Sequence, residues 1–229
     1  MEYPHNRPYT ADDLVRIITL LRDPVNGCPW DKVQTHTSIR MNFLEEAYEA
    51  VGALDLDDPV LMCEELGDVL MQVAFHTCME QETGRFTWEQ VCDGVCQKLI
   101  ERHPNIFGTQ PGYEGITDWD ALKNKEKGRR TLADDLESVP RAMPALMRAA
   151  KLQKRAARHG AALQGADAAA LADAAENLQT AQPASAQAEQ AVGELLFAAA
   201  NLARQAGVDP EQALQKANEA FCTAAGPVA

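Results

Sequence analysis

The sequence lacks the features that mark several large classes of protein. No apolar run is long enough to span a bilayer, and the first residues, MEYPHNRPYTADD, have neither the basic nor the apolar stretch of a secretory signal. None of the six cysteines forms a CxxC pair, which argues against a zinc ribbon and a dithiol redox motif. We therefore expect a cytoplasmic protein with no membrane partner.

Basic residues are scarce in the first half of the chain. Residues 1–120 hold 8 Lys and Arg against 22 Asp and Glu, whereas residues 121–160 hold 11 against 4. The formal net charge of the 229 residues is -13. A strongly acidic surface repels nucleic acid and anionic lipid, so we expect neither as a partner. If this half handles phosphate groups, a divalent cation must mediate.

Strand patterns are also missing, because the chain has no sustained period-two runs and no hairpin dipeptides between them. Helix signals take their place. Thr10 and Thr87 are placed to cap two helices, Pro59 fits the first turn of another, and a further helix is expected over about 37–54. The expected fold class is all-α, with helices paired across short turns.

The helical pattern occurs twice. CEELGDVLMQVAFHTCME aligns with EQAVGELLFAAANLARQA, and TWEQVCDGVCQKLIER aligns with DPEQALQKANEAFCTA. The second copy keeps the apolar positions and loses most of the polar ones. We expect a catalytic helical domain over 1–127, a linker over 128–139 and a degenerate, non-catalytic copy over 140–229. Within the latter, the Ala/Gln-rich segment 161–191 has weak sequence character, and the part of it that reads QTAQPASAQAEQ predicts a loop or poorly ordered linker.

Two groups of carboxylates stand out in the first copy. They are Glu45, Glu46 and Glu49 on one predicted helix, and Glu64, Glu65 and Asp68 on the next. Residues three or four apart share a helix face, so the groups can meet if the helices pair antiparallel. No basic residue lies four positions away, and unpaired carboxylates raise one another's pKa at the expense of stability. Carboxylate oxygens are the ligands that Mg²⁺ and Mn²⁺ prefer, so such a cation removes the conflict.

Two other interpretations fit part of this pattern. Acidic side chains often form the solvated outer face of a helix, but here they interrupt apolar positions, and the second copy dropped most of them while keeping its helix pattern. A di-iron bundle also directs carboxylates inward, and it requires Glu-x-x-His on two helices. His76 lies eight residues after Asp68 rather than three after a glutamate, which disfavours iron.

Cations near the acidic groups favour phosphate chemistry. Lys98 and Arg102 are four residues apart, and Trp119 and Lys123 repeat this spacing, although each pair taken singly is ordinary surface charge. No GxxxxGK[ST] loop, no GxSxG motif and no local Cys–His pair is present, so a P-loop enzyme and a nucleophilic side chain are disfavoured. Attack by water activated by a metal is the simpler hypothesis.

The acidic residues resemble the EExxE…ExxD signature of the MazG-type nucleoside triphosphate pyrophosphohydrolases, and CPWDKVQTH, KLIERHPNIFG and DWDALK are similar to further segments of that family. The resemblance implies the all-α NTP pyrophosphatase fold, a homodimer, and hydrolysis of a nucleoside triphosphate to the monophosphate and pyrophosphate. It implies that Mg²⁺, with Mn²⁺ as a substitute, is held by Glu46, Glu49, Glu65 and Asp68. Glu46 or Glu45 would help to deprotonate the attacking water. The substrate contacts that it implies are Trp30, Lys32, Lys98, Arg102, Trp119 and Lys123.

The second copy departs from the family pattern. Gln179, Ala191 and Glu194 stand where the first copy has two glutamates and an aspartate, and alanines replace the basic pair. In two-domain members of the family the second copy can carry the active site, whereas here we expect 161–229 to be silent. Three functions stay open: a broad pyrophosphohydrolase that guards the nucleotide pool, a narrower relative acting on dUTP/dCTP or phosphoribosyl-ATP, and a non-catalytic nucleotide-binding regulatory dimer.

Overall fold

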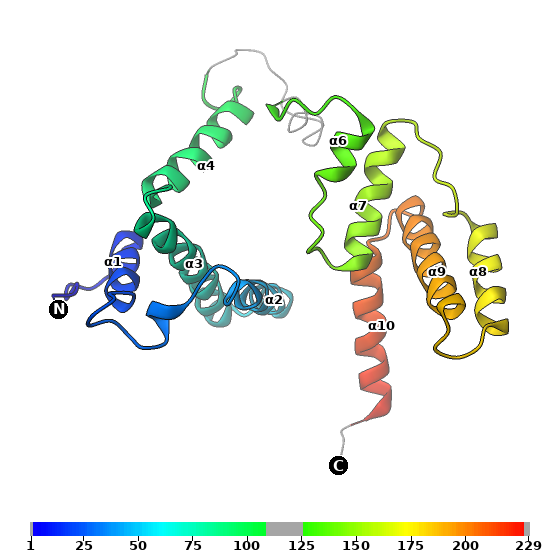
Figure 1. The fold of residues 1–229 in the computed structure, drawn as a ribbon, viewed down its shortest axis with the longest axis horizontal. Helices are drawn as coiled ribbons and strands as arrows, with labels where there is room; N and C mark the ends of the chain where they lie inside the picture. The colour runs from blue at the N-terminus through cyan, green and yellow to red at the C-terminus, as the bar shows by residue number, and fades with distance from the viewer. Residues whose placement is uncertain (1, 109–125, 227–229) are drawn as a thin grey trace. The chain divides into compact units, whose positions relative to one another are not determined.

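Every regular element of the described chain is a helix. The computed structural model describes residues 2–108 and 126–226 (Figure 1). The all-α class predicted from the sequence is therefore confirmed. The chain divides into two compact units, Met1–Ile116 and Thr117–Ala229. No helix in the described ranges has the length and apolar character needed to cross a membrane.

Short polar motifs start the helices of the first unit. Its elements are α1 (Ala11–Leu21), the 3₁₀ turn η1 (Asp31–Val33), α2 (Arg40–Leu56), α3 (Pro59–Glu82) and α4 (Trp88–Arg102). Thr10 and Thr87 form capping boxes with the residues three positions later, as predicted. Before α3, the Asp58 carboxylate accepts the N–H groups of Val60 and Leu61, with Pro59 in the first turn.

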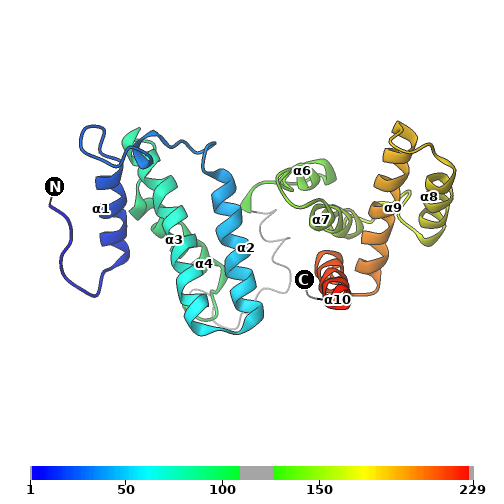
Figure 2. The same ribbon diagram turned by 90° about the horizontal axis from the view of Figure 1, so that it is seen from below.

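Helices α2 and α3 form a helical hairpin that carries the predicted acidic residues. The two lie side by side along most of their length, and α1 packs on α3 (Figure 2). Asp57, in the left-handed conformation with φ 53°, ends α2 and reverses the chain within two residues. The apolar core surrounds the second half of α3 and includes Ile18, Phe75 and Met79. The first half of α3 lies outside this core, which leaves its carboxylates room for a polar environment.

The second unit repeats this order of helices. Its elements are α6 (Leu132–Glu137), α7 (Ala145–Arg158), α8 (Ala168–Thr180), α9 (Ala186–Gln205) and α10 (Pro210–Ala225). Helices α8 and α9 pair as α2 and α3 do, and α7 packs on α9 as α1 packs on α3. The helix pairings therefore agree with the internal repeat seen in the sequence.

Residues 128–139, expected to be a linker, contain α6, which packs on α7. Thr131 caps the helix in a capping box with Asp134. The carboxylate of Asp135 is buried and lies 3.0 Å from Nη1 of Arg155 on α7. This buried pair fastens the segment to the second unit.

The loop or linker predicted for QTAQPASAQAEQ, residues 179–190, is confirmed in its middle and wrong at its two ends. Helix α8 occupies 168–180 and α9 begins at Ala186, so only 181–185 separate them. Asp167 and Ser185 cap the two helices through their side-chain oxygens. Alanine has the highest intrinsic helix propensity, so a stretch without a clear apolar stripe still folds as helix once α8 and α9 pack on each other.

Candidate functional site

Three of the predicted metal ligands come together between α2 and α3. Glu46, Glu49 and Glu65 each offer a carboxylate oxygen, and these oxygens lie within 4.8 Å of one another. Glu46 and Glu65 are half-buried and Glu49 is exposed. Oxygens around a six-coordinate Mg²⁺ are about 2.9–4.2 Å apart, because each lies about 2.0–2.1 Å from the ion. A small inward shift of these side chains would therefore bring their oxygens to the separations found among the ligands of one Mg²⁺ ion.

The carboxylates repel one another. Burial, followed by the charges of Asp68 and Glu49, raises the pKa of Glu46, while a hydrogen bond from Gln72 opposes the shift. Burial, then the charges of Glu49, Asp68 and Glu64, raises the pKa of Glu65. Among the described residues no basic side chain forms an ion pair with either glutamate. The donor set and its unneutralised charge fit a hard divalent cation.

Asp68 and Glu45 occupy different places relative to this cluster. Asp68 is half-buried, and its charge acts on both Glu46 and Glu65, although it is not one of the three residues within 4.8 Å. Glu45 is exposed and lies outside the group. Of the two residues predicted to deprotonate water, only Glu46 is therefore part of the cluster.

Gln72 is a part of the site that the sequence analysis did not find. Its side-chain amide donates to Oε1 of Glu46 at 3.4 Å. Gln72 is only 7% exposed, and its own Oε1 has no hydrogen-bond partner in the described chain. A buried acceptor without a partner is costly and calls for a ligand, a water or an ion. The sequence feature that could have identified Gln72 is its position four residues after Asp68, which puts the two side chains on the same helix face.

The loop that precedes α2 carries Trp30 and Lys32. Trp30 is 57% exposed and Lys32 is half-buried in η1. Arg22, at the end of α1, donates to two backbone carbonyls of this loop at 2.8 and 3.2 Å. The same guanidinium holds Glu82 of α3 through two hydrogen bonds of 2.5 and 2.8 Å. Arg22 therefore fixes the loop to the helices, while neither Trp30 nor Lys32 belongs to the carboxylate cluster.

Two of the predicted phosphate contacts lie on α4, and two fall outside the described residues. Lys98 is exposed and Arg102 is half-buried, both on α4. Trp119 and Lys123 fall in 109–125, outside the described ranges. Their roles in binding substrate stay predictions.

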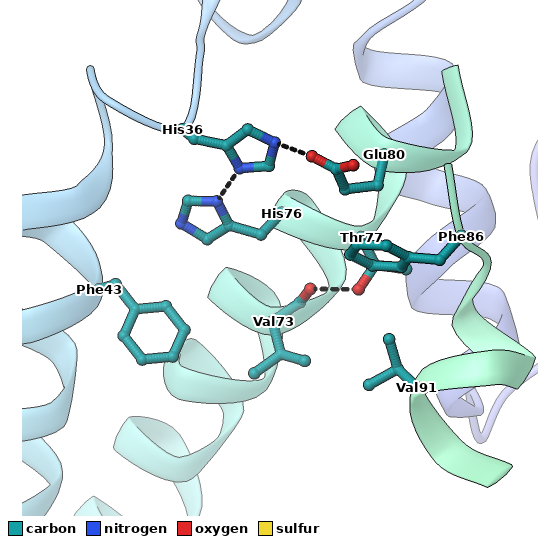
Figure 3. A pocket seen from close by; sticks show the side chains of 8 residues that line it. All are labelled: His36, Phe43, Val73, His76, Thr77, Glu80, Phe86 and Val91. Carbon is teal, nitrogen blue, oxygen red and sulfur yellow. Dashed lines mark hydrogen bonds and ion pairs between the residues drawn. The ribbon is translucent and has the colours of Figure 1, made fainter. Parts of the chain in front are cut away.

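A second group of polar side chains lies further along α3. Nδ1 of His36 is 2.7 Å from Nδ1 of His76, and Nε2 of His36 is 2.5 Å from Oε1 of Glu80. Beside them is an open pocket of about 510 Å³ (Figure 3). The sequence analysis considered His76 only as evidence against iron. His36 lies 40 residues earlier, so no local pattern connects the two.

The second unit differs from the first at the equivalent positions. Ala191 is buried, and Glu194 accepts a hydrogen bond of 2.8 Å from Gln190. In the described part of this unit no three acidic, His or Cys side chains are grouped as Glu46, Glu49 and Glu65 are. That 161–229 is silent stays a prediction.

The fold and site define an all-helical protein with an unneutralised acidic site between two paired helices. Residues 34–107 match the MazG nucleotide pyrophosphohydrolase domain. The chain is 41% identical to the nucleoside triphosphate pyrophosphohydrolase of Escherichia coli K12, across 92% of this chain and 83% of that protein. It is 39% identical to the nucleoside triphosphate pyrophosphohydrolase/pyrophosphatase MazG of Thermotoga maritima, across 92% and 82%. A protein of Mycobacterium tuberculosis with the first of these names is 34% identical across 66% of this chain and 46% of its own length.

The chain thus belongs to the MazG family of nucleotide pyrophosphohydrolases. The family predicted from the acidic signature is confirmed. The matched segment, 34–107, contains α2, α3 and α4 and therefore the whole carboxylate cluster.

Proposed function

We propose that this protein hydrolyses nucleoside triphosphates to the monophosphate and pyrophosphate, with Mg²⁺ or Mn²⁺, and so clears the nucleotide pool. The observation that carries the proposal is the cluster of Glu46, Glu49 and Glu65 within 4.8 Å, unpaired, on the hairpin of a MazG domain. Its relatives are named for this reaction.

Each side chain of the cluster has a role in this proposal. Glu46, Glu49, Glu65 and Asp68 hold the cation, which when bound offsets charge on the phosphate oxygens and acidifies water. Glu46 is also proposed to accept a proton from the attacking water, since of the two residues predicted for this role it is the one that lies in the cluster. The anhydride bond between the α- and β-phosphates breaks, and pyrophosphate leaves.

The basic and aromatic residues outside the cluster have proposed roles in binding the substrate. The leaving pyrophosphate carries more negative charge than one cation neutralises, so Lys98, Arg102 and Lys123 are proposed to bind it. Trp30 and Lys32 are proposed to line the same site from the loop that Arg22 anchors.

A homodimer is part of the proposal. Helix α4 exposes Val95, Leu99 and Ile100, which are 49%, 50% and 41% exposed. Val95 and Leu99 are four residues apart and share one face of α4, whereas Ile100 lies about 100° around the helix from Leu99. Exposed apolar side chains grouped on one helix are typical of a surface that is covered in an assembly.

The test is pyrophosphate release from a panel of NTPs and dNTPs in Mg²⁺, with Glu49→Gln compared with Glu194→Gln. Replacing a metal ligand is expected to cost at least about 100-fold in activity, more than loss of an outer-shell partner. Glu194→Gln is the control, because it makes the same Glu→Gln change in the second unit, at the position that aligns with Asp68, and is expected to leave the rate unchanged.

Other outcomes contradict parts of this proposal. Release from dUTP and dCTP only, or from phosphoribosyl-ATP only, would replace it by a narrower substrate. Nucleotide binding without any release would indicate the regulatory dimer. An equal loss of activity in the two variants would show that the second copy is not silent.

A further inference from the structure

The pocket beside His36 and His76 is apolar on its walls and polar at one end. Its walls are Phe43 near the start of α2, Val73 on α3, Phe86 in the segment between α3 and α4, and Val91 in the first turn of α4 (Figure 3). The polar end consists of His36, His76, Thr77 and Glu80. A volume of about 510 Å³ is within the usual range for a small-molecule site. The pocket is therefore suited to a flat, largely apolar group that also carries a polar edge.

The charges at the polar end are already paired. Nε of Arg85 lies 2.7 Å from Oε2 of Glu80, and Arg85 also donates to Oε1 of Glu80 at 2.7 Å. Nε2 of His36 lies 2.5 Å from Oε1 of the same Glu80 carboxylate, although the contact does not have the angles of a regular hydrogen bond. No side chain that lines the pocket is Lys or Arg. A phosphate has nothing to bind there, so the occupant is the uncharged part of a ligand.

The contact with His36 uses one of the two ring nitrogens of His76. Nδ1 of His76 lies 2.7 Å from Nδ1 of His36, and the two share a hydrogen bond. Nε2 of His76 has no hydrogen-bond partner in the described chain, so it is the ring nitrogen left to meet a ligand. Burial, and then the neighbouring His36, lower the pKa of His76, which keeps its ring neutral near pH 7.

The pocket adjoins the carboxylate cluster along the same hairpin. Gln72 touches Glu46, and His76 is one helical turn beyond Gln72, about 6 Å along α3. Phe43 is three residues before Glu46 on α2, and its ring is 5.8 Å from that of His76. A nucleotide whose phosphates lie at the cluster can therefore place in the pocket the group that is attached to the other end of its ribose.

We propose that this pocket receives the nucleobase of the triphosphate, with Nε2 of His76 forming a hydrogen bond with the edge of the base and Phe43 and Phe86 packing on its ring. The proposal rests on the proposed function and names the part of the substrate that this second site binds. Each base has both a hydrogen-bond donor and an acceptor on its edge, so a single ring nitrogen between apolar walls discriminates little among bases. The pocket thus favours a broad set of nucleotides over one preferred base.

The test measures binding rather than turnover, by calorimetry in Mg²⁺ with two ligands: α,β-methylene-ATP and inorganic triphosphate. His76→Phe keeps a ring but removes the hydrogen-bonding nitrogen. It is expected to weaken binding of the nucleotide about 3- to 10-fold, the range for one neutral hydrogen bond, and to leave triphosphate binding unchanged. His76→Gln, whose amide restores both a donor and an acceptor, is expected to recover part of the affinity. His5→Phe, at the exposed N-terminal segment, is the matched control and changes neither ligand.

A second variant covers the case in which His76→Phe does not fold. Phe86, 38% exposed at the rim, can be truncated with little effect on the core. Phe86→Ala is expected to weaken binding of the nucleotide about tenfold, because stacking on the base is lost, and to leave binding of triphosphate unchanged. If the variants weaken binding of both ligands equally, or weaken binding of neither, the proposal that this pocket receives the base is wrong.

This experiment separates the pocket from the reaction. If wild type releases pyrophosphate and His76→Phe and Phe86→Ala bind the nucleotide normally, the base pocket is wrong while the function stands. If wild type releases none, yet binds α,β-methylene-ATP and loses affinity only in the pocket variants, the proposed function is wrong and the pocket stands.

Discussion

At the scale of single residues, Glu46 and Glu65 reduce the stability of the protein that holds them. Both have a pKa above the usual value of 4.5 in the folded chain. The folded state therefore binds protons more tightly than the unfolded state, and stability is lost as pH rises from the unfolded pKa through the folded pKa. At neutral pH the loss is complete unless a cation offsets the charge. This is the pattern expected where a site is built for binding rather than for stability.

Glu65→Gln tests this conflict. Without divalent cation the variant is expected to have a higher Tm than wild type at pH 7, because one of the mutually repelling charges is gone, and nearly the same Tm at pH 4. Adding MgCl₂ is expected to raise the Tm of wild type more than that of the variant. Thermal unfolding followed by circular dichroism measures both effects.

The matched control is Glu101→Gln, which removes an exposed acid of α4 outside the cluster. It is expected to respond to pH and MgCl₂ as wild type does. A lower Tm for metal-free Glu65→Gln at pH 7 would show that Glu65 stabilises the fold, contrary to this account.

At the scale of elements, the start of α3 sets the register of the site. The carboxylate of Asp58 accepts from the backbone N–H of Val60 at 2.9 Å and of Leu61 at 3.2 Å. Since Glu65 and Asp68 lie within the next three turns, the cap and the two-residue turn before it decide which residues of α2 they face. The hairpin places its functional groups through local backbone contacts far from the apolar core.

Asp58→Ala is expected to destabilise the protein by about 1 kcal/mol, the usual cost of losing an N-cap. Urea unfolding monitored by helix signal gives this value directly. Asp58→Asn keeps the accepting oxygen and is expected to lose little. If the two variants unfold at the same urea concentration, the side-chain cap is not what stabilises the start of α3.

At the scale of the whole molecule, exposed apolar side chains predict self-association. The exposed apolar residues Val95, Leu99 and Ile100 lie on α4, the helix that also carries Lys98 and Arg102. If α4 is covered by a second copy, dimerisation would also fix the predicted phosphate contacts in place. Assembly and substrate binding are then expected to depend on one helix.

Leu99→Glu is expected to convert a dimer into a monomer, because it buries a charge in an apolar interface. Light scattering after size-exclusion chromatography measures the mass. Gln97→Ala changes an exposed polar residue of the same helix and is expected to leave the mass unchanged. A monomeric wild type would contradict the prediction.

Local patterns were sufficient for some features because the interactions behind them are local. The capping boxes at Thr10 and Thr87 and the turn before Pro59 involve residues within four positions of one another, so their helix starts could be read directly. The loop predicted over 179–190 is too long because residues 186–190 fold as helix where α9 packs on α8, which the composition of the segment does not show.

The sequence by itself determined the all-helical class, the family and the helix faces that carry Glu46, Glu49, Glu65 and Asp68, because helical periodicity and capping are properties of neighbouring residues. Only the tertiary structure decided which carboxylates come within 4.8 Å, that Gln72 is buried against Glu46, and that His36 meets His76 across 40 residues of chain. Contacts between distant segments depend on how the helices pack, and that packing is a property of the whole core rather than of any local stretch.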